Sequence, residues 1–369
     1  MRARIVAGMA LALAFAACGG TPPPRAQSAP PPPPPEPSAR YLALVIDETV
    51  YAIDPETGAE EPLPAFADGA RPTYILALPG GEGFLVDHGD AIVRGDAGAP
   101  VTYREPPVLA GLAERVGLAA ADPAGETLVL EHGLHDGYRV RFEVVRADGT
   151  RTMLAEVAYS GEAAVSAGGE YAAVSGIPSD CQVLHECQFN IWWIDLRDPD
   201  AELQRLVGRD DRSYYKPRFA QRGGDPWLVY QSTAADASSA CDDNINECRH
   251  DLYQRRFPDG RDERLQPFAL TFAPGPNESY GFLGHARCGN MPDCHDNGYT
   301  LRYVERGADR VVSETATIFL PNAVSPDGRY AVYIDTLRGR QSCVVEIQTG
   351  EVRVCREGSP RGWLRAPAD

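Results

Sequence analysis

The fold is decided by the stretch Ala323–Asp335, which reads AVSPDGRYAVYID. A short strand leads into a turn at Ser325–Gly328, and a second strand follows in which Tyr330, Val332 and Ile334 occupy alternate positions. In such a turn proline presets φ, aspartate caps the turn with its side chain, and glycine supplies a positive φ. The stretch therefore predicts a strand–turn–strand unit of an antiparallel sheet.

Weaker copies of this unit recur upstream. The positions that align with Gly328 are Gly81, Gly125, Gly169, Asp225 and Glu278. Successive positions are 44, 44, 56, 53 and 50 residues apart. A period near 44 residues, lengthened where cysteine-containing loops are inserted, is typical of the four-stranded blade of a β-propeller.

A second set of turns runs in phase with the first, and each turn follows an expected third strand. These turns are Ile53–Gly58, Val145–Gly149, Ile194–Asp198, Phe257–Gly260 and Ile347–Gly350. Helical periodicity is almost absent, so we predict an all-β protein, a β-propeller of four-stranded antiparallel blades. Our count is seven blades, with six or eight as alternatives. Trp363–Arg365 would supply the missing inner strand of the first blade and close the ring, which removes exposed strand edges.

The turn Ser325–Gly328, followed by an alternating strand, resembles the TolB-type, WD-repeat-like propeller family. The repeat pattern covers nearly everything from residue 41 onward. This resemblance implies a periplasmic-type propeller scaffold, and it carries over no catalytic residues.

The N-terminus has the features of an export signal. Two arginines precede an apolar run at residues 5–17, which is shorter than the roughly 20 residues that span a bilayer but suits a signal peptide. Phe15–Cys18 resembles the lipobox of bacterial lipoproteins, in which the cysteine is lipidated and becomes the mature N-terminus. An ordinary secretion signal, with Cys18 incidental, is the alternative. Gly19 resembles the pattern of lipoproteins that travel to the outer membrane.

We therefore divide the chain into three parts: a lipoprotein signal peptide (1–17), a lipidated cysteine with a proline-rich linker (18–40), and a propeller domain (41–369). The linker composition favours extended polyproline II and predicts a semi-rigid tether. The expected location is the bacterial envelope, with lipid anchoring and the outer membrane favoured.

The formal net charge of −17 argues against nucleic acid and against anionic lipid head groups as partners. Membrane contact is therefore expected through the lipid anchor only, and we expect a monomer. Lys216 is the only lysine among the 35 lysine and arginine residues. We attribute this excess of arginine to coding bias rather than to chemistry.

Nine cysteines less Cys18 leave eight, and an even number in an exported chain predicts four disulfides. The spacing suggests the local pairs Cys181–Cys187, Cys241–Cys248, Cys288–Cys294 and Cys343–Cys355. Zinc binding is the rival interpretation, but no Cys-x-x-Cys pair is present and the expected compartment is oxidising.

Three expected second-to-third strand connections are unusually long: Gly176–Gln188, Ser232–His250 and Gly284–Asn297. All seven histidines are expected in connections of this kind: His88, His132, His135, His185, His250, His285 and His295. We name as a candidate binding face the residues His185, Asp242, Asp243, His250, His285, Asp293, His295 and Asp296. No cofactor is predicted, and convergence of these side chains on a divalent metal is the alternative.

Catalytic signatures are missing: there is no Gly-x-Ser-x-Gly elbow and no phosphate-cradling glycine loop before a helix. The adjacent Trp192 and Trp193 are expected in the core. We therefore favour a non-enzymatic, lipid-anchored scaffold that binds an envelope protein or cell-wall component through its cysteine-containing loops. The alternative is a metal-dependent hydrolase, lyase or lactonase-like enzyme with its centre at the axial channel of the loop face.

Overall fold

The structure is a computed structural model in which two units divide the chain, Met1–Pro37 and Ser38–Asp369. It describes residues 40–47, 49–63, 74–81, 83–87, 92–95, 100–101, 116–134, 139–181, 187–206, 212–233, 250–267, 269–276, 278–285, 299–314, 316–318, 320, 322–335 and 338–366. The predicted signal peptide, Cys18 and the predicted linker up to residue 39 lie outside these ranges.

The described residues are almost entirely β-structure, as predicted, with one short 3-10 turn, η2 (Pro79–Gly81). Five sheets have four antiparallel strands each. They are β27 (Ser359–Arg365), β1 (Tyr41–Asp47), β2 (Thr49–Ile53) and β3 (Glu60–Pro62); β4 (Tyr74–Ala77), β5 (Phe84–Asp87), β6 (Ile92–Gly95) and β7 (Pro100–Val101); β15 (Tyr214–Arg222), β16 (Asp225–Thr233), β17 (His250–Arg256) and β18 (Glu263–Gln266); β19 (Ala269–Pro274), β20 (Tyr280–His285), β21 (Tyr299–Glu305) and β22 (Ala308–Ser313); and β23 (Ala316–Ile318), β24 (Tyr330–Asp335), β25 (Gln341–Glu346) and β26 (Val352–Glu357).

A sixth sheet has seven strands in the order β14 to β8. Its members are β8 (Val116–Ala121), β9 (Thr127–Gly133), β10 (Val140–Arg146), β11 (Arg151–Val165), β12 (Tyr171–Pro178), β13 (Asn190–Asp195) and β14 (Gln204–Arg205). The long β11 pairs with β10 through Arg151–Val157 and with β12 through Val157–Val165. One continuous strand therefore ends one group of four strands and begins the next.

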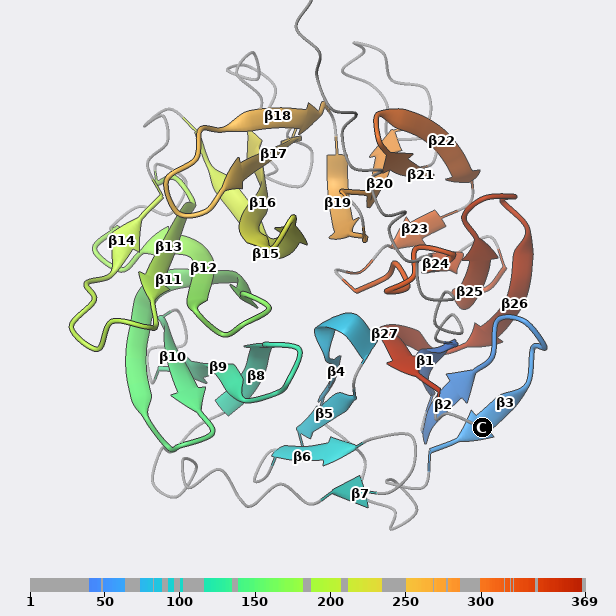
Figure 1. Ribbon diagram of the computed structural model, residues 1–369, viewed down its shortest axis with the longest axis horizontal. Coiled ribbons are helices and arrows are strands. Elements are labelled where there is room, and N and C mark those ends of the chain that lie inside the picture. The colour runs from blue at the N-terminus through green and yellow to red at the C-terminus, as the bar shows by residue number, and fades with distance from the viewer. Residues whose placement is uncertain are drawn as a thin grey trace, which may run out of the picture. The chain divides into compact units, whose positions relative to one another are not determined.

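Within Ser38–Asp369 the sheets follow one another in a propeller-like arrangement, and the first strands β4, β8, β15, β19 and β23 lie on its inner side (Figure 1). The C-terminal strand β27 pairs with β1, and Trp363 lies opposite Ala43, so closure by Trp363–Arg365 is confirmed. The indole Nε1 of Trp363 donates to the Ala323 carbonyl at 3.0 Å, and its ring stacks on Tyr330. The last strand is thereby joined to the stretch that defines the repeat.

Several turns between first and second strands share one geometry. In the turn Ser325–Tyr330 the Ser325 N–H donates to the Tyr330 carbonyl, and the Gly328 N–H donates to the Ser325 carbonyl, both at 2.8 Å. The same two bonds join Asp122 with Thr127 and Gly125, and Ser166 with Tyr171 and Gly169. At the first position Asp122, Ser166 and Ser325 also accept backbone N–H groups through their side-chain oxygens. This conserved bonding explains why the repeat is visible in the sequence.

The sequence alignment was wrong at one copy. Gly81, Gly125, Gly169, Glu278 and Gly328 all have positive φ, as the alignment requires. Asp225, however, begins β16, and the positive φ values fall on Gly223 and Gly224. This hairpin turns on two residues, Arg222 pairing with Asp225, so the glycines needed for the turn come earlier than in the other copies.

The inner strands are bulged. Register shifts occur between Leu118 and Ala120 in β8, Ser160 and Ala163 in β11, Tyr215 and Arg218 in β15, Ala269 and Thr271 in β19, and Ala316 and Ile318 in β23. A β-bulge leaves one or more residues out of the ladder and redirects their side chains and backbone groups. The skipped residues are therefore available for contacts between neighbouring sheets.

Apolar clusters fill the space between neighbouring sheets. Trp193 is buried against Tyr171 and Phe257, with ring centroids 6.0 and 4.7 Å away, so its predicted place in the core is confirmed. Trp192 points to the other face of β13 and is only half-buried against a second cluster. Alternation along a strand explains why these adjacent residues differ.

Candidate functional site

Each sheet has two different ends. We call the edge at which second strands begin, near Tyr171, Tyr280 and Tyr330, the turn end. The opposite edge, at which second strands finish, is the loop end. The three longest second-to-third connections run from Pro178 to Asn190, from Thr233 to His250 and from His285 to Tyr299, so they start and finish at the loop end of three successive groups of strands. Their predicted positions are confirmed to within a few residues.

Most of the candidate binding face lies outside the described residues. This applies to His185, Asp242, Asp243, Asp293, His295 and Asp296, and to His88 and His135 among the other histidines. His250 is described as the first residue of β17, opposite Thr233, and is half-buried. His285 is the last residue of β20, opposite Tyr299. Both positions agree with a loop-end face, although each histidine belongs to a strand rather than to the connection.

The prediction for His132 was wrong. Pairing of β9 with β10 continues to Gly133 opposite Val140, so His132 lies inside a strand and the connection begins only later. Its side chain is buried, and Nε2 lies 3.1 Å from Oε2 of Glu143. Burial lowers the pKa of His132, and the adjacent Glu143 carboxylate opposes that shift. This histidine is part of the sheet and cannot belong to a binding face.

Two of the four predicted disulfides lie in the described residues, and both are confirmed. Cys181–Cys187 links the two sides of the first long connection. Cys343–Cys355 joins directly opposite residues of β25 and β26, with the Cα atoms 4.1 Å apart. The pairs Cys241–Cys248 and Cys288–Cys294 lie outside the described residues.

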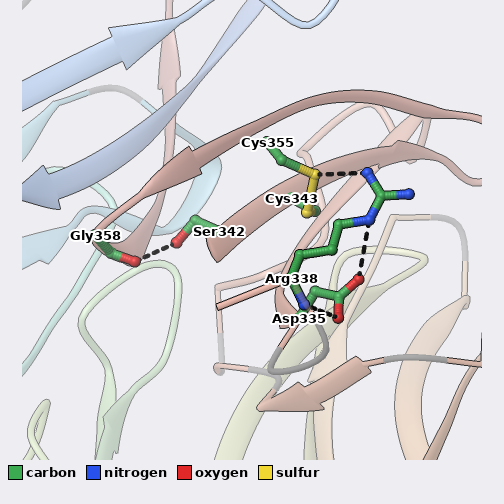
Figure 2. Close-up of a disulfide and its surroundings, with 6 residues drawn as sticks. All are labelled: Asp335, Arg338, Ser342, Cys343, Cys355 and Gly358. Carbon is green, nitrogen blue, oxygen red and sulfur yellow. Dashed lines mark hydrogen bonds and ion pairs between the residues drawn. A yellow bond between two sulfur atoms is a disulfide. The ribbon is translucent and has the colours of Figure 1, made fainter. Parts of the chain in front are cut away.

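In the last sheet the connection at the loop end, between β24 and β25, is short, and side chains at this end bond to one another (Figure 2). Arg338, between β24 and β25, forms an ion pair with the buried Asp335 at 3.5 Å, and its Nη1 lies 3.7 Å from Sγ of Cys355. The Ser342 hydroxyl donates to the Gly358 carbonyl at 2.7 Å. Here side chains that extend from the loop end are used to hold the fold together.

In the middle sheets the loop end carries a row of aromatic side chains. The Tyr215 ring lies 4.8 Å from that of Phe189, which precedes β13, and 5.1 Å from that of His250. Burial raises the pKa of Tyr215, against a hydrogen bond from Ser213 that lowers it. Phe189 precedes β13, whereas Tyr215 and His250 belong to the next sheet, formed by β15 to β18.

Bulge residues connect the inner strands at this end. Glu162, skipped in the register of β11, forms an ion pair with Arg218 of β15. Lys216, skipped in β15, donates from Nζ to the Leu270 carbonyl at 3.0 Å, and Leu270 is the residue skipped in β19. The bulges therefore do more than bend the strands, because they supply the groups that join three successive inner strands.

Lys216 itself has an unusual environment. Its φ of 50° lies in the left-handed region, which side chains other than glycine rarely adopt. Burial lowers the pKa of its ammonium group, and no nearby carboxylate contributes to that pKa. Within the described ranges, the Leu270 carbonyl is the partner of Nζ and no acidic side chain forms an ion pair with it. Among the described residues, the half-buried Lys216 therefore has no compensating negative charge.

Reasoning from the sequence missed Phe189, Tyr215 and Lys216. The available signal was the proline after Lys216, because proline inside a strand pattern marks a bulge or an edge.

Neither a metal centre nor a membrane span is found in the described residues. No group of three or more histidine, cysteine, aspartate or glutamate side chains in this part of the chain could hold a metal ion. No described helix is long and apolar enough to cross a membrane. Because most of the predicted binding face lies elsewhere in the chain, the metal alternative stays a prediction.

Comparison with known proteins identifies the fold. No protein-family model matches the chain, and no curated protein matches it. Solved structures do match: an oligogalacturonate lyase in complex with manganese has 13% identity and a TM-score of 0.56, covering 81% of this chain and 82% of that one. The tricorn protease has 11% identity and a TM-score of 0.54, covering 88% of this chain and 36% of that one. TolB from Acinetobacter baumannii has 14% identity and a TM-score of 0.47, covering 90% and 67%.

At these identities the structural matches show the fold alone. The lyase and the protease, with TM-scores above 0.5, confirm the predicted β-propeller. The chain spans about a third of the length of the tricorn protease. TolB is among the structures with a related fold, but its lower TM-score adds nothing to the assignment.

Proposed function

We propose that this chain is a seven-bladed, TolB-like propeller that binds a protein or cell-wall component of the bacterial envelope at its loop end. The count of seven follows if the seven-stranded sheet is two blades that share the continuous strand β11, in addition to the five four-stranded sheets. A lipid anchor at Cys18, a position on the outer membrane and a monomeric state complete the proposal and rest on the sequence.

The observation that carries the binding role is the concentration of unusual groups at the loop end of the middle sheets. The row Phe189–Tyr215–His250, the half-buried Lys216 and the 52% exposed side chain of Tyr159 all lie there. Aromatic and cationic side chains held on rigid strands between long connections are typical of recognition surfaces.

A pull-down from envelope extracts tests this proposal with a control on the same strand. Tyr159 and Met153 are both exposed residues of β11, but Tyr159 lies at the loop end and Met153 near the turn end. We expect a partner to be captured by the unaltered chain and by Met153→Ala, and to be reduced in Tyr159→Ala and lost when residues 235–248 are replaced by a short glycine–serine linker. Equal capture by all four proteins would contradict binding at the loop end.

The metal-dependent hydrolase or lyase remains the second candidate, because one propeller of the same fold is an oligogalacturonate lyase in complex with manganese. It requires His250 or His285 to act with histidines and carboxylates of the long connections. Metal analysis of the purified chain, before and after dialysis against a chelator, distinguishes the two. Stoichiometric manganese or zinc that disappears in His250→Ala would favour the enzyme.

A further inference from the structure

Lys216 is the feature that the binding proposal does not yet explain. It is the only lysine of the chain, and every other basic residue among the 35 is arginine. It also has a left-handed backbone conformation and precedes a proline, in a strand that otherwise pairs regularly with β16. For a residue with a Cβ this conformation is strained, and such strain concentrates at functional sites.

The ammonium group has hydrogen-bonding capacity to spare. A lysine ammonium has three N–H donors, and in the described residues one of them is directed to the Leu270 carbonyl. A carbonyl carries no full negative charge, so it compensates the cation only in part. A half-buried ammonium without a counter-ion is costly, and an anion beside it would recover that cost.

We propose that Nζ of Lys216 is the centre of an oxyanion-binding site that takes a carboxylate or phosphate group of the ligand at the loop end. This inference gives the chemistry of the ligand and rests on the binding function proposed above. The neighbouring Arg218 forms an ion pair with Glu162, whereas no described acidic side chain pairs with Lys216.

The rest of the protein makes such a site short-ranged. A net charge of −17 repels anions at a distance, so an anion would be held by direct contact with the ammonium rather than by the field of the whole protein. This also explains why a lysine is kept among so many arginines. A compact ammonium fits one oxygen in a narrow place, whereas a guanidinium presents a planar fork.

Because Lys216 is the only lysine, the full chain grown with lysine labelled with 13C at Cε gives a single lysine resonance. We would titrate it with sodium acetate, with sodium phosphate and with sodium chloride at matched ionic strength. A saturating shift with acetate identifies a carboxylate site, and one with phosphate identifies a phosphate site. A small shift that grows linearly and equally with all three salts would overturn the proposal.

A variant separates anion binding from a purely structural link between β15 and β19. The apparent affinity for the anion can be obtained from the rise in melting temperature with anion concentration. Lys216→Met should lower this affinity about tenfold or more, the loss expected for one charge-assisted hydrogen bond. Arg222→Met, at the turn end of the same strand, is the matched control and should keep the full effect. An anion effect in Lys216→Met equal to that of the unaltered chain would contradict the site. If Lys216→Met does not fold, the resonance titration decides alone.

The two proposals fail separately. Small anions need no protein partner, so an oxyanion site at Lys216 can be present even if envelope extracts yield nothing. Suppose that the partner is still captured by Lys216→Met and in saturating anion, and that the lysine resonance does not shift in the titration. These results would support the binding role and contradict the oxyanion site.

Discussion

The turn end and the loop end of the sheets are built from the same strands but differ in regularity. At the turn end, Ser325, Ser166 and Asp122 repeat one pattern of backbone and side-chain hydrogen bonds. At the loop end, the described residues differ from one group of strands to another. The last sheet closes with the short, bonded segment around Arg338 (Figure 2), whereas the middle sheets carry long connections and the bulge contacts of Lys216 and Glu162.

We relate this difference to the proposed function: the regular turn end stabilises the fold, and the irregular loop end carries the proposed binding site. The turns that share this pattern satisfy the same backbone groups in each copy and add nothing that distinguishes one copy from another. Departures from the repeat at the loop end cost backbone strain at Lys216 and burial of its charge, and the repeating turns do not require them. Large changes of stability should therefore follow from substitutions at the turn end, and changes of binding from those at the loop end.

The largest effect is expected at Trp363, which joins the closing strand to the turn end. Its side chain is 2% exposed, and it both stacks on Tyr330 and donates to the Ala323 carbonyl. Trp363→Ala should lower the free energy of unfolding by about 3–5 kcal/mol, the usual cost of emptying a buried aromatic site. Denaturant titration measures it, and the half-buried Trp192→Ala is the control that should lose less. Equal losses would mean that closure adds no stability beyond ordinary packing.

Two aligned turn positions allow a finer test of the turn end. Glu278 and Gly328 both have positive φ, 64° and 73°, but only glycine adopts this region without strain. Glu278→Gly should raise the free energy of unfolding by about 1 kcal/mol, and Gly328→Ala should lower it by about 1–2 kcal/mol. A Cβ at Gly328 would also lie 3.0 Å from Cγ of Pro276. If the two changes shift the unfolding midpoint in the same direction, the turns are not equivalent.

How much the sequence predicted follows the same division. The repeat, the all-β class and the closing strand could be predicted, because turn residues and strand alternation are local patterns. Two disulfides followed from spacing alone. The inner-strand contacts could not be predicted: Pro217 marks an irregularity in its own strand, but a bulge is a mismatch between two strands, and the sequence does not give the partner of Lys216. The link from Lys216 to Leu270 joins residues that have no shared motif, and the place of His132 depends on how far β9 continues to pair.

The smallest effect concerns His132, which the sequence placed in a loop-end connection and the structure places inside a sheet. Because burial lowers its pKa, the unfolded chain binds a proton at a higher pH than the folded protein does. The folded state should therefore lose stability as pH falls below about 6.5, the ordinary histidine value, toward the lowered pKa. His132→Gln should make the pH dependence of unfolding shallower between pH 7.5 and 5.5, with little change in slope above that range, where His132 is neutral in both states. Urea midpoints at a series of pH values measure this pH dependence. Parallel curves for the two proteins would contradict a lowered pKa for His132 and the burial that causes it.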